Sequence, residues 1–306
     1  MPGAYAHITL VHSCIDATAR HGGLSPATAR AVTTSRSHAE LGAVSPDYPY
    51  LAGHTGWADL MHHEATNALL HAALQSIQTL AGEPRDRAVA WLLGYASHMV
   101  ADMTIHPVIN ALVGPYEQNK AAHRACEMNM DAQAFKRMGL GDVGLSDHLL
   151  SNLAACCAPA DPTELDAVVA EVWTRALCQA HPQTAARDTP APRLWHHGFL
   201  RVMSAIREAN HLLPFARHLG VDAELDYPDP KDIDPRYVQA LPTPLGPMDY
   251  DPLLDRAIDN ASRFWGELDA VLSGADPHRL DALPSWNLDT GLSTGAMPQK
   301  VYWREG

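Results

Sequence analysis

Along most of the chain, hydrophobic residues recur at intervals of three and four, which is the pattern of amphipathic α-helices. The alternation of hydrophobic and polar residues that is typical of half-buried strands does not occur, and no internal repeat is present. The pattern predicts helices over about residues 6–20, 56–80, 84–113, 118–138, 146–157, 161–179, 194–219 and 254–272. We therefore expect an all-α fold, a single multi-helix domain with little strand.

Proline marks several of the expected boundaries. Ser25-Pro26 and Asp161-Pro162 predict helix starts, in which a capping side chain precedes a proline at the first helical position. Pro107 is expected to break or kink its helix, and the proline-rich run 45–50 is expected to be a loop. We also expect a linker over 181–192, a kink at 214, irregular structure over 227–252 and an extended tail from 284.

These boundaries predict a helical core over residues 1–180 that carries the candidate chemistry. Residues 181–306 are expected to add further helices and an irregular tail that pack on the same domain. All five cysteines lie within this first part, three in isolation and two as an adjacent pair, and no CxxC pair occurs, so a thiolate zinc site is not expected.

The amino-acid composition disfavours some classes of function. The chain has 306 residues, of which 46% are hydrophobic and 19% charged, and a formal net charge of −13. This balance disfavours nucleic-acid binding, because binding to phosphates needs basic side chains. The first ten residues lack the basic start and apolar run of a signal peptide. No apolar run reaches the roughly 18 residues of a transmembrane helix. We therefore expect a cytoplasmic protein.

The chemistry is concentrated in one series of histidines and carboxylates. His98, Asp102 and His106 follow one another at four-residue steps within one predicted helix, so they share a helix face. His123 and Glu127 form a second pair at the same step. Burying such groups is costly unless they bind something, and neutral imidazole with carboxylate is a ligand set of zinc. The series therefore predicts a metal site.

Further potential ligands precede this series. His7 lies near the start of the first predicted helix, Asp47 lies in the proline-rich run, and His62 is favoured over His63 by its surroundings on the next helix. Each has a plainer explanation by itself, because a lone histidine on a hydrophobic helix face is usually a hydrogen-bonded core residue. A histidine and a glutamate four residues apart often form an ordinary surface pair. The whole set, rather than any one member, favours a metal cluster.

In these residues the chain resembles the zinc-dependent bacterial phospholipase C family, which is related in fold to the trinuclear-zinc single-strand nucleases. The resemblance covers about residues 4–135. It lies in the segments 6–16 (AHITLVHSCID), 41–47 (LGAVSPD) and 94–107 (GYASHMVADMTIHP), followed by His123-x3-Glu127.

The resemblance implies a cluster of two or three zinc ions. The implied ligands are His7, Asp47, His62, His98, Asp102, His106, His123 and Glu127. Asp47, His62, His98 and Asp102 would hold the first ion. Asp102 would bridge to a second ion, which His7 would also hold. His106, His123 and Glu127 would hold the third ion. Asp47 would in addition be the catalytic residue that orients or deprotonates the attacking water.

The resemblance also implies a phosphoric ester hydrolase of the phospholipase C type. Water activated by the metal would attack the phosphorus of a phospholipid or another small phosphate ester. Tyr48 matches a family position that lines the headgroup pocket, where a ring can face a quaternary ammonium group, and His54 is a further candidate for substrate binding. Two alternatives stay open. One is a related zinc hydrolase acting on nucleotides, single-stranded nucleic acid or phosphomonoesters, and the other is a repurposed, non-catalytic metal protein.

Two features depart from that pattern. The spacing from Asp102 to His106 is shorter than in the secreted phospholipases of the family. The family's second zinc also takes the amino group of an N-terminal tryptophan, whereas this chain has Met1-Pro2-Gly3 ahead of His7. That zinc is therefore missing, takes another ligand such as His12, or is replaced by a different metal. Three segments, 195–197 (WHH), 250–252 (YDP) and 286–291 (WNLDTG), either cover the cluster and set specificity or simply pack against the helices. The sequence does not indicate an oligomeric state.

Overall fold

The computed structural model describes residues 3–140, 156–158, 161–208, 227–276, 280 and 283–303, and the fold is all-α, as predicted. The first helices are α1 (Ala4–His21), α2 (Pro26–Thr34), α3 (Arg36–Val44), α4 (Tyr48–Leu51), α5 (Thr55–His63), α6 (Thr66–Gln78), α7 (Gly82–Val113) and α8 (Lys120–Phe135). The later helices are α10 (Ala167–Ala180), α11 (Pro182–Ala185), α12 (Pro192–Glu208) and α13 (Tyr250–Leu272). Most of the helix predicted over 146–157, and the expected kink at 214, lie outside the described residues.

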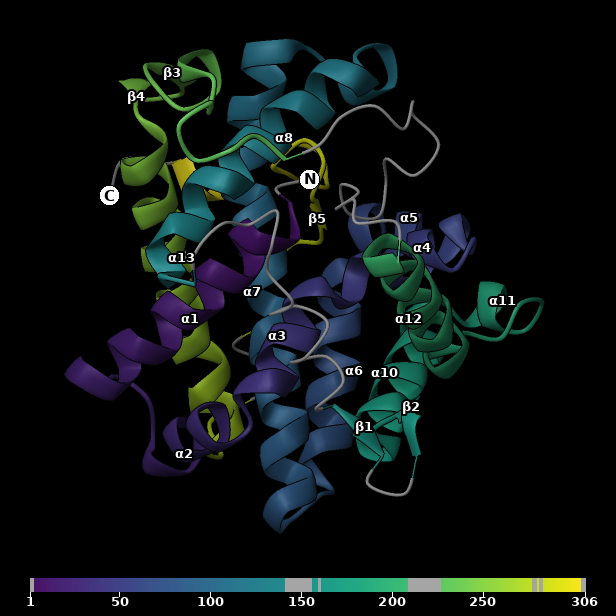
Figure 1. Ribbon diagram of the computed structural model, residues 1–306. Helices are drawn as coiled ribbons and strands as arrows, with labels where there is room; N and C mark the ends of the chain where they lie inside the picture. The colour runs from purple at the N-terminus through teal and green to yellow at the C-terminus, as the bar shows by residue number, and fades with distance from the viewer. Residues whose placement is uncertain are drawn as a thin grey trace.

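Helix α7 is the centre of the domain (Figure 1). Every residue from Ala88 to Ile109 is buried, so this stretch meets neighbours on all sides, as expected for a helix that is hydrophobic all round. The helices that pack on it are α1, α2, α3, α6, α8, α10 and α13. Residues from both halves of the chain share one hydrophobic core, and the division at residue 180 stays a prediction. The predicted ligand series on α7 therefore lies deep inside the protein.

Two glycines allow α3 and α7 to cross with their backbones in contact. A Cβ atom at Gly42 would lie 2.0 Å from the carbonyl oxygen of Trp91, and one at Gly94 would lie 1.9 Å from that of Ala39. Only a residue without a side chain fits at either position. The close crossing brings the end of α3 within hydrogen-bond distance of His98.

The proline-rich run 45–50 is helical, and the predicted loop is wrong. Residues Ser45–Asp47 form a 3-10 turn, η1, and α4 follows directly. Each of these short helices has a proline within its first two positions, where the missing N–H has no helical partner to lose. The prolines therefore start helices here rather than exclude them.

The prediction of one helix over 56–80 is also wrong, because the chain turns between α5 and α6. Ala65 adopts a left-handed conformation, with φ of 49°, and separates the two helices. Helix α7, by contrast, continues through Pro107, and the break predicted there is absent. A proline at this position cannot donate to the carbonyl of Met103. The backbone of Gly291 lies against that carbonyl, since a Cβ on this glycine would be 2.9 Å from the oxygen.

The helix start predicted at Asp161-Pro162 is a strand instead. Residues Asp161–Leu165 form β2, which pairs antiparallel with β1 (Cys157–Ala158). Helix α10 begins only after Asp166, whose carboxylate accepts hydrogen bonds from two backbone N–H groups of the first turn. The carboxylate that directly precedes the hydrophobic run of the helix is thus the cap. The other predicted cap, Ser25 at the start of α2, is confirmed.

The C-terminal part contains short elements as well as helices. The remaining strands form two hairpins, β3 (Leu241–Thr243) with β4 (Gly246–Met248), and β5 (Trp286–Asn287) with β6 (Leu292–Ser293). The 3-10 turns beyond η1 are η2 (Tyr116–Gln118), η3 (Lys136–Met138), η6 (Pro235–Tyr237) and η8 (Val301–Trp303). The tail from residue 284 is thus more ordered than an extended segment, because one hairpin and one turn lie within it.

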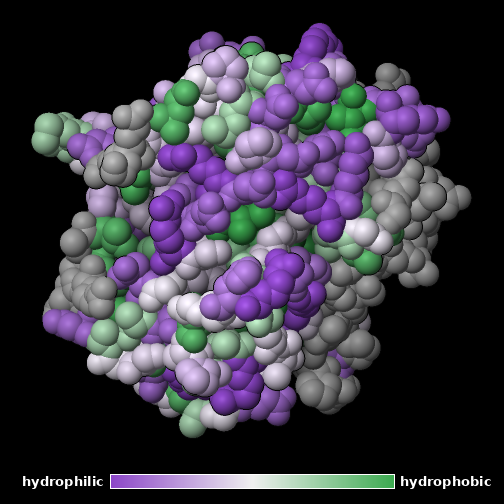
Figure 2. All heavy atoms as spheres, turned by 90° about the vertical axis from the view of Figure 1, so that its left-hand side faces the viewer, coloured by the Kyte–Doolittle hydropathy of each residue, from purple (hydrophilic) through white to green (hydrophobic). Residues whose placement is uncertain are grey.

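Helix α13 is amphipathic and begins four residues before its predicted start at 254, with Pro252 in its first turn. Its exposed side chains recur every four residues, at Asp255, Asp259, Arg263 and Glu267. Figure 2 shows a broad band of hydrophilic side chains, with hydrophobic residues among them, across the face on which α1, α13 and the β3–β4 hairpin lie. Among the described residues, no helix is long and apolar enough to cross a membrane.

Candidate metal centre

Four elements bring five of the predicted ligands together. Helix α7 supplies His98 and Asp102, α1 supplies His7, η1 supplies Asp47, and α5 supplies His62. All five are buried, with at most 2% of each residue exposed. Two overlapping groups have ligand atoms within 4.8 Å of one another: one joins His7, His98 and Asp102, and the other joins Asp47, His62 and His98.

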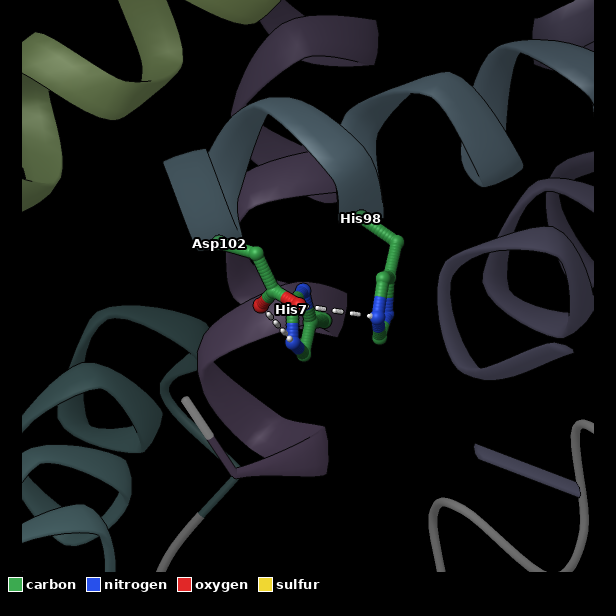
Figure 3. A group of neighbouring side chains, drawn as sticks. All are labelled: His7, His98 and Asp102. Atoms are coloured by element: carbon green, nitrogen blue, oxygen red, sulfur yellow. Dashed lines mark ion pairs between the residues drawn. The ribbon is translucent and has the colours of Figure 1, made fainter. Parts of the chain in front are cut away.

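The carboxylate of Asp102 lies between histidines from different helices. Its Oδ1 is 3.4 Å from Nε2 of His7 on one side. Its Oδ2 is 3.3 Å from Nε2 of His98 and 3.9 Å from Nε2 of His62 on the other. Figure 3 shows the rings of His7 and His98 side by side next to this carboxylate, stacked with centroids 4.0 Å apart. The two oxygens thus face two different sets of nitrogen atoms.

Backbone carbonyls fix which nitrogen of two histidines faces the site. His98 Nδ1 donates to the carbonyl of Ala43 at 2.8 Å, and His62 Nδ1 donates to that of Ala58 at 2.7 Å. A carbonyl only accepts, so the proton of each neutral ring is on Nδ1 and each Nε2 carries a lone pair. These two Nε2 atoms lie only 3.3 Å apart. Two lone pairs facing each other at this distance need a shared cation or an additional proton between them.

Several other buried polar atoms of the site have no hydrogen-bond partner. They are both ring nitrogens of His7, both carboxylate oxygens of Asp102 and Oδ1 of Asp47. Unpaired polar atoms are rare in protein interiors because each costs the free energy of its lost hydration. Imidazole nitrogen and carboxylate oxygen are the usual ligands of zinc. The residues therefore fit a bound zinc ion, which would pair these atoms.

The local environment favours the metal-binding forms of Asp102, His7 and His106, whereas it favours the protonated form of His98. Burial by itself raises the pKa of Asp102, but the neighbouring rings of His98 and His106 hold it well below its usual value. Burial lowers the pKa of His7 and brings that of His106 to about 4. For His98, burial lowers the pKa, but the carboxylate of Asp102 outweighs it and the net shift is upward. An ionised carboxylate and neutral imidazoles are the forms that bind a metal.

The remaining three predicted ligands are buried but fall outside the two groups found among the described residues. His106 Nδ1 donates to the carbonyl of Leu288 at 2.5 Å, and its Nε2 has no hydrogen-bond partner. His123 Nε2 donates to the carbonyl of Gly114 at 2.6 Å, and its Nδ1 lies 3.6 Å from Oε1 of Glu127. Each histidine again offers one free nitrogen, and the third metal position stays a prediction.

The two predicted substrate-binding residues occupy different surroundings. Tyr48 is fully buried. Its ring stacks on Phe199 of α12 with centroids 4.8 Å apart, and its hydroxyl lies 3.4 Å from Nδ1 of His196. His54 is half-buried and precedes the first turn of α5. Tyr50, two residues after Tyr48, is half-buried, with its ring centroid 5.8 Å from that of His62. The roles of Tyr48 and His54 stay predictions.

The two alternative histidine ligands, His12 and His63, both point to carboxylates. His12 Nε2 lies 2.5 Å from Oε1 of Glu40, and His63 Nε2 lies 3.0 Å from Oδ2 of Asp289. His12 follows His7 by five residues and so projects about 140° away from it on the helix. The structure therefore brings His62, rather than His63, to the cluster and leaves His12 on another face of α1.

Asp131 supports the site and was missed in the sequence. It follows Glu127 by a further four-residue step on α8, so the periodicity of the series was the available signal. Its carboxylate accepts hydrogen bonds from the backbone N–H groups of Ala6 at 2.7 Å and Tyr5 at 3.3 Å. It thereby caps the first turn of α1, the helix that carries His7.

Replacing Asp131 with alanine is expected to lower the free energy of unfolding by about 1–2 kcal/mol, the usual effect of removing a helix cap. Urea denaturation of the variant measures the change. The control is Asp259→Ala, which removes an exposed carboxylate of α13 and should leave the midpoint near that of the wild type. Equal midpoints for all three proteins would show that this carboxylate does not hold α1 in place.

The fold and the site together define an all-α protein with a candidate zinc centre buried at its central helix. A comparison with protein-family models matches residues 6–181, more than half of the chain, to the family described as zinc-dependent phospholipase C. The chain therefore belongs to the zinc-dependent phospholipase C family, which confirms the resemblance and places it among zinc-dependent hydrolases. The matched residues include all eight predicted ligands. Neither the curated proteins nor the solved structures that were compared gave a match.

Proposed function

We propose that the protein hydrolyses a phosphodiester bond of a phospholipid headgroup, or of a closely related small phosphate ester, in a reaction that depends on zinc. The observation that carries the proposal is the position of Asp102. Its two oxygens face Nε2 of His7 on one side and Nε2 of His98 on the other, at 3.4 and 3.3 Å. A carboxylate shared in this way is typical of hydrolases that hold two metals close together.

The ligand sets follow from the resemblance, and the two groups of neighbouring ligand atoms support the first two of them. Asp47, His62, His98 and Asp102 would hold one ion, and His7 with Asp102 would hold a second. His106, His123 and Glu127 would hold a third. When bound, zinc supplies positive charge against the phosphoryl oxygens and lowers the pKa of a coordinated water. The buried residues exclude bulk water and hold the free nitrogens in place.

Asp47 is proposed as the residue that orients or deprotonates the attacking water. Its Oδ1 is buried, has no hydrogen-bond partner and lies 3.4 Å from Nε2 of His62. A carboxylate that is held rigidly beside the reacting water and lacks another donor is suited to accept its proton. Pro46 and Pro49 flank this aspartate and limit the motion of its backbone.

The substrate class follows from the family, which implies a lipid phosphate ester. Tyr48 and His54 are proposed to contribute to the headgroup site, since both belong to the segment that follows Asp47. The formal net charge of −13 opposes the approach of a long polyanion such as single-stranded DNA. A zwitterionic headgroup such as phosphocholine has no net charge and does not experience this repulsion.

The deciding experiment compares three substrates with the zinc-loaded wild-type protein. They are p-nitrophenyl phosphocholine, p-nitrophenyl phosphate and single-stranded DNA, and the metal content is measured in parallel by elemental analysis. We expect bound zinc and hydrolysis of the phosphocholine ester well above that of the other two. Activity confined to the monoester or to DNA would replace the lipid substrate with another one. A protein without bound metal would overturn the proposed function.

Asp47→Asn is expected to lower kcat for the phosphocholine ester by about 10²- to 10⁴-fold, the usual contribution of a positioned base. Zinc content, measured on the same samples, separates loss of the base from loss of an ion. The control is Asp86→Asn, which makes the same chemical change at an aspartate paired with Arg30 on the surface side of α7. A kcat equal to that of the wild type would exclude Asp47 from the reaction.

A further inference from the structure

A short segment near the C-terminal end of the described chain lies against the candidate metal centre. It comprises residues 286–291, which begin in β5 and end at Gly291. Trp286 and Leu288 are fully buried. The segment lies outside residues 6–181, the part of the chain that matches the family. Its contacts with the site are therefore additions to what the family match itself covers.

The backbone of Leu288 contacts two of the proposed zinc ligands at once. Its carbonyl accepts the hydrogen bond from Nδ1 of His106 at 2.5 Å. Its N–H donates to the carbonyl of His62 at 2.8 Å. That carbonyl lies in the last turn of α5, where the helix itself leaves carbonyl groups without partners. One residue thus completes the end of α5 and fixes the ring of a histidine on α7.

The hydrogen bond to Leu288 determines which nitrogen His106 presents. A carbonyl oxygen can only accept, so Nδ1 carries the proton and the buried, unpartnered Nε2 carries the lone pair. His98 and His62 obtain the same orientation from the carbonyls of Ala43 and Ala58. Those two acceptors belong to the matched part of the chain, whereas the acceptor for His106 does not.

Side chains on both flanks hold the segment in place. Asn110, one turn beyond His106 on α7, donates to the carbonyl of Asp289 at 2.6 Å. The carboxylate of Asp289 lies 3.0 Å from Nε2 of His63 on α5. Gly291 packs so tightly that a Cβ atom there would be 2.3 Å from the ring of Pro107. The segment is thus fixed to both α5 and α7, the helices that carry the two histidines that it contacts.

We propose that residues 286–291 are a positioning element of the zinc centre. Through Leu288 they hold His106 in the tautomer that offers Nε2 to the metal, and they fix the end of the helix that carries His62. Asn110 and Asp289 act as positioning residues, because they touch neither metal nor substrate and hold the segment instead. This inference rests on the proposed function in one respect, the binding of zinc by these histidines.

The test uses Asn110→Ala and Asp289→Ala in the full chain, with Thr294→Ala as the matched control. Thr294 belongs to the same C-terminal region and also donates a side-chain hydrogen bond to a backbone carbonyl, that of Ser285, which precedes the segment and is not a proposed zinc ligand. Zinc affinity is measured by competition with a chelator. The absorption spectrum of the cobalt-substituted protein reports the ligand geometry directly, which a general loss of stability would not alter. Circular dichroism checks that each variant is folded.

The two positioning variants are expected to bind zinc about 10- to 100-fold more weakly, as is usual when the hydrogen-bond partners of ligands are disturbed. Their cobalt spectra should differ from that of the wild type, whereas Thr294→Ala should match the wild type in both measurements. Unchanged affinity and spectra in Asn110→Ala and Asp289→Ala would overturn this inference alone. If the wild-type protein itself bound no zinc, the proposed function would fail with it, so the two failures are distinguishable.

Discussion

Replacing Asp102 with alanine is expected to abolish hydrolysis of the phosphocholine ester and to release at least one zinc ion. Both oxygens of this carboxylate face histidines that the proposal assigns to different ions, so its loss disturbs both positions at once. A metal at the reacting phosphate contributes several kcal/mol to the transition state. The rate should therefore fall by about 10³-fold or more, because each 1.4 kcal/mol corresponds to a factor of about ten. Elemental analysis and the esterase assay measure the two effects.

The matched control is Asp259→Ala, which removes an exposed carboxylate from the outer face of α13. It should retain the metal content and the activity of the wild type. If Asp102→Ala retained both as well, this carboxylate would be a buried structural residue and the shared-carboxylate geometry would carry no function. A variant that kept zinc but lost activity would instead limit the role of Asp102 to the reaction.

The second large effect is expected from removal of the metal. Zinc present at about a thousand times its Kd stabilises the folded state by about 4 kcal/mol. With an unfolding entropy of about 2 cal/mol/K per residue, the melting temperature of the dialysed, zinc-free protein should be about 6 °C lower. The physical reason is that His7, Asp47 and Asp102 keep buried polar atoms without partners when no ion pairs them.

Differential scanning calorimetry with and without chelator measures this shift. Adding zinc back should restore the higher melting temperature. The Asp102→Ala variant serves as the internal control, because it should show a much smaller shift on chelation. A wild-type melting temperature that does not respond to zinc or to chelator would contradict a metal at this site.

The local part of the site was predictable from the sequence, because its members share one helix. His98 and Asp102 stand four residues apart, and this spacing alone places them on one face of α7, where their side chains lie 3.3 Å apart. His7, Asp47 and His62 come from three other elements. No rule of helical spacing places these three residues beside α7. Only the order of the ligands along the chain, which resembles that of the family, predicted that they belong to the same site. The all-α fold was predictable for the same reason, since each helix shows its own periodicity.

The wrong predictions of secondary structure involve residues whose effect depends on whether they lie at the start of a helix or within it. The prolines of 45–50 predict a loop, but they occupy the first turns of short helices. Asp161 has the sequence pattern of a helix cap, but Asp166 lies next to the hydrophobic run and caps α10. The partners of the histidine rings were beyond prediction, because the acceptors at Ala43, Ala58 and Leu288 are backbone oxygens that every residue has.

The contact between Leu288 and His106 also bears on the order in which the protein assembles. The two residues are 182 positions apart in the chain. Bringing residues so far apart in the chain together lowers the chain entropy before the contact contributes any stabilising free energy. Such contacts are therefore expected to form late in folding. We therefore expect the ring of His106 to stay free to rotate until the helices around α7 have packed. We expect the site to reach its full affinity for metal only at the end of folding, so that partly folded chains hold zinc weakly.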